Sequence, residues 1–83
     1  MNEQTITIIV NGRQKTVDKN AELTFSQVVA LAFDNPPTGP NVLFTITYRK
    51  GGNEHRPDGE LTEGQTVKAK EGTVFNVTAT DKS

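Results

Sequence analysis

One stretch, residues 23–33, is the only segment of the chain that predicts a helix, and it determines what the other segments must supply. Thr24 stands at the N-cap position, and Gln27 three residues later completes a capping box. Leu23 and Val28 are spaced for a hydrophobic staple at the helix entry. One helical face carries Val28, Leu31 and Ala32. Because a helix of about ten residues is unstable alone in water, the rest of the chain must provide an apolar surface to cover it.

A β-hairpin is predicted at the start of the chain. Asn11-Gly12 is a strong type I′ turn signal because both residue types tolerate positive φ. Residues 5–10 alternate, and their inward side chains are expected to be Ile6, Ile8 and Val10. Residues 13–18 are mostly polar and predict an edge strand, where Arg13 and Lys15 discourage pairing with another sheet.

Three later segments also alternate and predict strands at residues 42–49, 66–70 and 73–80. Their expected inward side chains are Val42, Phe44, Ile46, Tyr48, Val67, Ala69, Phe75, Val77 and Ala79. Three prolines between residues 34 and 41 end the helix and predict a stiff, exposed loop. The connecting segments are predicted as a turn at 50–53, a short paired strand at 54–56, a turn at 57–59 and irregular or briefly helical structure at 61–64.

The order of these elements predicts an α+β fold of the β-grasp, or ubiquitin-like, type. A mixed four- to five-stranded sheet would pack on one helix, about Thr24–Phe33, with the first and last strands parallel at its centre. Eighty-three residues make one domain over 1–83, with frayed ends expected at about 1–4 and 81–83.

The composition argues against several classes of function. Nine Lys and Arg residues nearly balance ten Asp and Glu residues, so binding to nucleic acid or to a membrane through bulk charge is not expected. The chain has no cysteine and can form neither a disulfide nor a thiolate metal site. It also has no apolar run long enough for a membrane span or a signal-peptide core. A cytoplasmic location is therefore expected.

No catalytic, cofactor-binding or metal-binding residues are predicted. The only histidine, His55, lies in a polar turn, and no catalytic or metal-ligand motif surrounds it. Asp58, Glu60 and Glu63 lack the loop pattern of a calcium site. Gly51-Gly52 is not followed by the Lys and Ser/Thr of a phosphate-binding loop. An enzyme is therefore not expected, and function should lie in the surface and the chain end.

The outward side of the central strands is the candidate partner face. Its residues are Ile9, Leu43, Thr45, Val74 and Asn76. Ubiquitin-like folds commonly use this face for partners, but exposed apolar residues are common on any protein. Two interpretations stay open: a face that binds partners, and an ordinary surface that exposes a few apolar side chains. We expect Ile9→Asp or Leu43→Asp to leave the fold intact and to abolish partner binding.

Four stretches resemble the bacterial multiubiquitin family: Ile6–Gly12, Leu23-Thr24, Phe44–Tyr48 and Gly72–Phe75. The similarity covers about Thr5 to Thr80. It implies a ubiquitin-like protein modifier that an activating enzyme and a conjugating enzyme attach to target proteins or to itself. A JAB/JAMM-type protease would remove it again.

The C-terminal tail departs from the pattern that this resemblance implies. Ubiquitin-type modifiers end in Gly-Gly, because a tail without side chains threads the activating enzyme, whereas this sequence ends in Asp81, Lys82 and Ser83. The open alternatives are a processed or truncated chain, a different terminus for conjugation, or a non-conjugated β-grasp interaction module that acts as a scaffold or self-assembles. A sulfur-carrier role would also need a terminal glycine.

One internal segment, Arg49–Gly52, resembles a modifier end. Cleavage there would discard the final strand with Phe75 and Val77, and burying two such side chains contributes about 3–6 kcal/mol. That loss is comparable to the whole stability of a domain of this size. We therefore interpret the segment as a turn.

Overall fold

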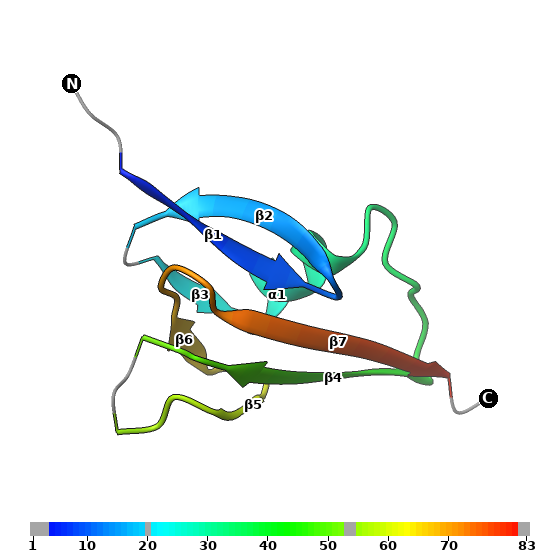
Figure 1. Cartoon of the computed structure of the whole chain (residues 1–83). Helices are drawn as coiled ribbons and strands as arrows, with labels where there is room; N and C mark the ends of the chain where they lie inside the picture. Colours follow the sequence, from blue (N-terminus) through cyan, green and yellow to red (C-terminus); the bar gives the residue numbers. More distant parts are fainter. Residues whose placement is uncertain (1–3, 20, 53–54, 82–83) are drawn as a thin grey trace.

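The computed structural model describes residues 4–19, 21–52 and 55–81, with only the backbone of Asp81. Three strands precede one helix, and four strands follow it (Figure 1). The elements are β1 (Thr5–Val10), β2 (Arg13–Asp18), β3 (Glu22–Thr24), α1 (Phe25–Ala32), β4 (Val42–Arg49), β5 (Gly59–Leu61), β6 (Thr66–Lys68) and β7 (Val74–Asp81).

Five strands form one mixed sheet in the order β2-β1-β7-β4-β5, and α1 lies across one of its faces (Figure 1). The first and last strands, β1 and β7, are parallel neighbours, and β4 pairs antiparallel with β7 over all eight of its residues. β2 stands at an edge, as predicted. These pairings confirm the predicted β-grasp arrangement of the α+β class. A second, two-stranded sheet joins β3 to β6.

The helix begins as the sequence predicts. The Thr24 side chain accepts a hydrogen bond from Gln27 N at 3.2 Å, and the Gln27 side chain accepts one from Thr24 N at 2.9 Å, so the capping box is complete. Val28 is fully buried, whereas Leu31 and Ala32 are only partly buried. Val29, which was not assigned to the buried face, is 7 % exposed. Val28 and Val29 are adjacent in the helix, so their side chains point about 100° apart around the helix axis. The face of α1 that packs on the sheet is therefore wide enough to include both valines.

The core lies between α1 and the inner face of the sheet. Its largest fully buried side chains are Phe75, Ile8, Ile46, Val10, Val28 and Thr73. The predicted inward positions on β1, Ile6, Ile8 and Val10, are all buried. On β4, only Ile46 is fully buried, and Val42, Phe44 and Tyr48 are partly exposed.

The partial exposure along β4 follows from the relative lengths of helix and sheet. The eight residues of α1 span about 12 Å, whereas the eight residues of β4 span about 26 Å. The helix therefore cannot cover both ends of the strand. Phe33, the C-cap residue, packs its ring against Phe44 with centroids 6.1 Å apart, and this contact extends the cover toward Val42.

Two short strands differ from the sequence prediction. Residues 54–56 were expected to form the short paired strand, but His55 and Arg56 are not in a strand, and Glu54 lies outside the described residues. Gly59–Leu61 pairs with β4 instead, opposite Ile46–Tyr48. A side chain at Gly59 would place its Cβ 2.9 Å from the Tyr48 hydroxyl, so glycine allows this approach.

β3 was expected to be a linker and helix entry, yet it pairs with β6 and buries Leu23 against Val67 in register. The strand predicted at residues 66–70 is shorter in the structure, because β6 ends at Lys68. The strand predicted at residues 73–80 is shifted by one residue, because β7 covers residues 74–81. The predicted frayed ends, 1–4 and 81–83, fall mostly outside the described residues. Within them, Gln4 O accepts a hydrogen bond from Lys19 N at 2.9 Å, and Asp81 is the last residue of β7.

Candidate functional site

In the described part of the chain, no element covers the face of the sheet opposite α1, which we call the open face (Figure 1). Its side chains alternate with the core side chains along β1, β7 and β4. They are Thr7, Ile9, Val74, Asn76, Thr78, Thr80, Leu43, Thr45, Thr47 and Arg49. All five residues of the predicted partner face therefore lie on the open face.

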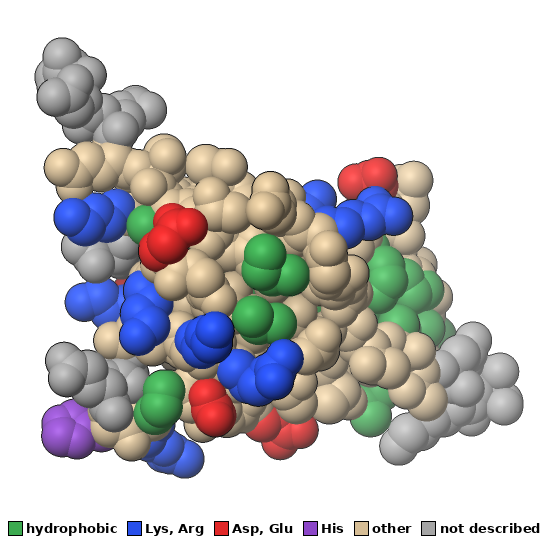
Figure 2. Space-filling model, in the orientation of Figure 1, with side chains coloured by type: hydrophobic (Ala, Val, Ile, Leu, Met, Phe, Trp, Pro, Cys, Tyr) green, Lys and Arg blue, Asp and Glu red, His purple; other side chains and the backbone are tan. Residues whose placement is uncertain are grey.

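Ile9 and Val74 are register partners across the parallel β1–β7 pair, and both side chains are partly buried. We call these two residues the Ile9–Val74 patch. Arg49, on β4, is the register partner of Val74 on the other side of β7. Figure 2 shows a small hydrophobic area in the middle of this face, with Lys and Arg side chains below it and to its lower left, and an acidic side chain to its upper left. The patch is thus apolar, and its lower border is basic.

Leu43 lies far from this patch. Its side chain is 49 % exposed and its register partner is Thr80. Leu43 and Arg49 are six positions apart on β4, which is a distance of about 20 Å along an extended strand. Thr45 and Asn76 lie in the polar stretch between the two ends. The structure therefore brings Ile9 and Val74 together and leaves Leu43 at the opposite end of the face.

The turn after β1 holds the Ile9–Val74 patch in place through the side chain of Asn11. This side chain continues the parallel β1–β7 pairing beyond the end of β1. Its Nδ2 donates to Val77 O at 3.1 Å, and its Oδ1 accepts from Val77 N at 2.8 Å. Asn11 N donates to Phe75 O at 3.0 Å. Asn11 also adopts φ 52° and Gly12 φ 80°, which confirms the predicted turn with two positive φ values.

Thr73 anchors the other end of the patch. Its side chain is fully buried and its hydroxyl donates to Lys50 O at 2.8 Å while accepting from Lys70 N at 3.0 Å. Its carbonyl accepts from Ile9 N at 2.9 Å. Thr73 thus joins the turn after β4, the turn before β7 and the C-terminal end of β1. Among the described residues, every buried side-chain nitrogen and oxygen atom has a hydrogen-bond partner.

The internal Gly-Gly pair is part of the folded structure. Gly51 is buried, and its N–H donates to Pro57 O at 2.7 Å. Gly52 N donates to Lys68 O at 2.8 Å. Lys50 before them adopts φ 60°. These bonds tie residues 50–52 to two other segments, and they agree with the interpretation of Arg49–Gly52 as a turn.

The predicted C-terminal tail is only partly described. Asp81 ends β7, opposite Val42 at the start of β4. The side chain of Asp81 and all of Lys82 and Ser83 lie outside the described residues.

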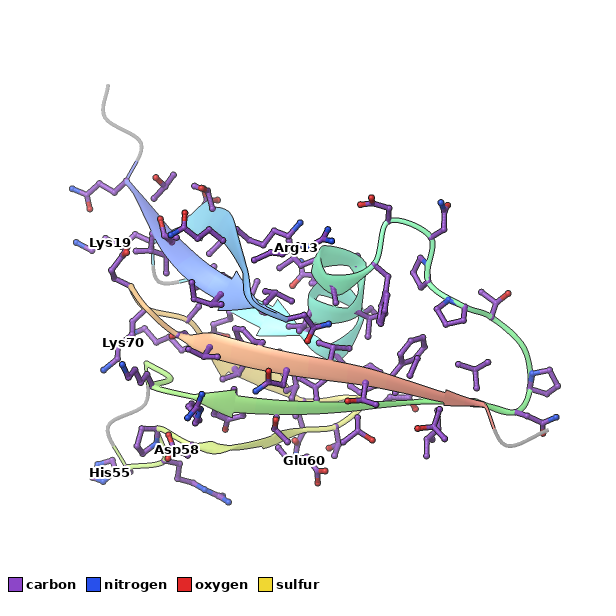
Figure 3. The ribbon with its side chains drawn as sticks, turned by 45° about the vertical axis from the view of Figure 1, so that its right-hand side comes forward. Arg13, Lys19, His55, Asp58, Glu60 and Lys70 are labelled. Atoms are coloured by element: carbon purple, nitrogen blue, oxygen red, sulfur yellow. The ribbon has the colours of Figure 1, made fainter. Side chains whose placement is uncertain are left out.

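His55 is exposed in the segment between β4 and β5 (Figure 3). Within residues 4–19, 21–52 and 55–81, no group of three or more His, Cys, Asp or Glu side chains is arranged to hold a metal ion. None of the described helices has the length and apolar character needed to cross a membrane.

The sequence prediction did not identify the roles of Asn11 and Thr73 in holding the patch. Asn11 was interpreted only as a turn residue, and Thr73 only as the start of a strand. The available signal was that both polar residues directly flank apolar strands, where a polar side chain can bond the backbone of a neighbouring strand or turn.

A protein-family model described as Multiubiquitin matches residues 6–81. Searches of curated proteins and of solved structures gave no match.

Proposed function

The chain belongs to the multiubiquitin family, and from this premise we propose that it is a ubiquitin-like protein modifier of a bacterial ubiquitination-like pathway. The proposed partners are an activating enzyme, a conjugating enzyme, a JAB/JAMM-type protease, and target proteins or the protein itself. The proposed location is the cytoplasm. In this role the chain is a folded domain that other proteins recognise, and it performs no chemistry and needs no cofactor.

The observation that carries this proposal is the Ile9–Val74 patch on the open face. Two partly buried apolar side chains lie at the centre of a polar, threonine-rich surface, and an apolar centre with a polar rim is typical of protein interfaces. Arg49 beside Val74 adds a basic border that favours an acidic partner. A patch of this size suits transient recognition by successive enzymes.

Incubation of the full-length natural gene product with its cognate activating enzyme and ATP tests the proposal. We expect release of pyrophosphate and a covalent adduct through the C-terminus, detected by intact mass. Ile9→Asp places a charge in the apolar contact and is expected to slow adduct formation at least about tenfold, which corresponds to about 1.4 kcal/mol.

Two control variants test whether slower adduct formation is specific to the Ile9–Val74 patch. Ser26→Asp makes an equivalent change at an exposed position of α1, on the opposite side of the sheet, and should react like the wild type. The sequence alone predicted a loss of partner binding for Leu43→Asp, but the structure places Leu43 about 20 Å from Arg49 along β4, so we now expect this variant to retain activation. Circular dichroism of each variant checks the fold. A defect in Leu43→Asp with normal activation of Ile9→Asp would move the partner surface to the other end of the open face.

An unmodified wild-type chain in this assay would overturn the modifier proposal. It would favour the non-conjugated interaction or scaffold module, because that alternative needs no activating enzyme.

A further inference from the structure

One edge of β4 has no strand beside it in the described part of the chain. β7 pairs with all of β4, but β5 pairs only with Ile46–Tyr48. In Figure 1 the half of β4 that begins at Val42 therefore runs beside β7 alone. Four residues, Val42–Thr45, leave about 13 Å of strand edge open. Alternate backbone N–H and C=O groups of an open edge point outward and can pair with an added strand.

Directly after β5, a turn directs the chain away from this edge of β4. Continuation of the β5 register would place residues 62–65 opposite Val42–Thr45. Instead, Gln65 N donates to Thr62 O at 3.1 Å, and the Gln65 side chain accepts from Thr62 N at 3.2 Å. Gly64 adopts φ 86°, which turns the chain away. The position of a sixth strand is thus left open by a hydrogen-bonded turn.

A groove of about 390 Å³ runs along this edge between β4 and the start of α1. Its apolar lining includes Phe25, Val42, Phe44 and Leu61. Leu43, the large hydrophobic residue exposed on the other side of the strand, also borders it. A strand added here would meet apolar side chains on both of its faces.

The charge at one end of the groove indicates the chemistry of the occupant. Glu60 and Glu63 both line the groove and are exposed, and Glu60 lies opposite Thr47 at the point where β5 is still paired (Figure 3). Basic side chains would be attracted to this end and acidic ones repelled. A second copy of the chain would bring its other edge strand, β2, which carries Arg13 and Lys15 on the helix side. Those charges would meet the apolar lining formed by Val42 and Phe44, so a second copy fits less well.

From these observations we propose that the Val42–Thr45 edge binds an extended peptide segment of a partner protein by β-strand addition. The segment carries apolar residues at alternate positions, which enter the groove, and a Lys or Arg at the end beside Glu60 and Glu63. Backbone pairing supplies the register, and the alternate side chains supply selectivity. This site is separate from the Ile9–Val74 patch and does not depend on the proposed modifier function.

A synthetic peptide tests the site on the full chain. The probe is an acetylated and amidated heptapeptide, Lys-Thr-Val-Thr-Val-Thr-Lys, titrated into isotopically labelled protein and followed by amide NMR. We expect saturable shift changes at residues 42–45 and 61–63, and slower hydrogen exchange at alternate amides of residues 42–45. Two further peptides carry proline in place of the central threonine or of the valine after it. Because only alternate N–H groups of the added strand face β4, one of these two peptides should lose binding. A peptide with glutamate in place of both lysines should bind about tenfold more weakly at low salt.

Variants of the protein test whether Glu60 and Glu63 attract the basic end of the peptide. The double variant Glu60→Lys and Glu63→Lys changes two exposed side chains and should weaken the lysine peptide about tenfold at low salt, while improving the glutamate peptide. The double variant Asp18→Lys and Glu22→Lys makes the same change of net charge at two exposed positions outside the groove lining, and this matched control should bind both peptides as the wild type does.

Three results would overturn the proposal: no shift at residues 42–45 at the highest soluble peptide concentration, shifts centred on β2 instead, or binding of both proline peptides as tight as that of the parent peptide. Concentration-dependent broadening of the same amides without peptide would assign the edge to a second copy of the chain and would also overturn it.

Discussion

The Asn11 side chain offers the sharpest test of how the centre of the sheet is held together. Its amide makes two hydrogen bonds with the backbone of Val77, at 2.8 and 3.1 Å, and Val77 is 6 % exposed. Removing a partner from a buried backbone group costs about 1–3 kcal/mol. Asn11 itself is exposed, so water can partly replace its amide. We therefore take the lower end of that range for each bond and expect a loss of about 2 kcal/mol from Asn11→Gly.

A second substitution separates the hydrogen bonds from the backbone conformation. Asn11→Ala removes the same amide and also places an alanine at φ 52°, which adds about 1 kcal/mol. Its expected loss is therefore about 3 kcal/mol. Because the folding free energy of a domain of this size is about 4–12 kcal/mol, either variant should be clearly measurable.

Urea unfolding followed by circular dichroism measures both variants. With a slope of about 1 kcal/mol per molar urea, the midpoint of Asn11→Gly should fall by about 2 M and that of Asn11→Ala by about 3 M. Asn35→Gly, at an exposed position in the loop after α1, is the matched control for the backbone entropy that glycine adds to the unfolded chain. If Asn11→Gly differs from Asn35→Gly by less than about 0.5 kcal/mol, the Asn11–Val77 bonds do not stabilise the sheet as argued.

Three further predictions concern the same fold. Thr73→Val keeps the side-chain shape but leaves two partly buried backbone groups, Lys70 N and Lys50 O, without their hydroxyl partner, and calorimetry should show a loss of about 2–4 kcal/mol; an unchanged melting temperature would contradict this role. Thr24→Ala removes half of the capping box shared with Gln27 and should cost about 1 kcal/mol in urea unfolding, with Thr24→Ser as the variant that retains stability. Gly51→Ala would place a Cβ 3.1 Å from Pro57 O and should destabilise the chain by about 1–3 kcal/mol; thermal unfolding equal to the wild type would refute the close approach.

The sequence predicted the long elements correctly because their signals are local. The alternation of residues 5–10 and 42–49, the Asn11-Gly12 turn and the Thr24–Gln27 capping box each depend on neighbouring residues alone, and all are present. β5 was missed because Gly59–Leu61 has no strand signal of its own. It becomes a strand only where Tyr48 and Ile46 of β4 provide a partner.

The candidate site was predicted less completely than the fold. Alternation assigned Ile9, Val74 and Leu43 correctly to one side of the sheet. It could not give their separation, because that distance depends on the register between strands that are far apart in the chain. The Asn11–Val77 bonds were missed for the same reason, since these two residues are 66 positions apart in the sequence.

The place of β7 at the centre of the sheet has a consequence for synthesis and folding. This strand pairs with β1 on one side and β4 on the other, yet it follows every other strand in the chain. A nascent chain emerging from the ribosome can close the β1–β2 hairpin and cap α1 early, since both depend on local contacts. It cannot bury Ile8 or Ile46 fully until residues 74–81 have been translated. Folding should therefore be slow for a chain of this length, because full burial of the core waits for the non-local pairing of β7 with β1 and β4.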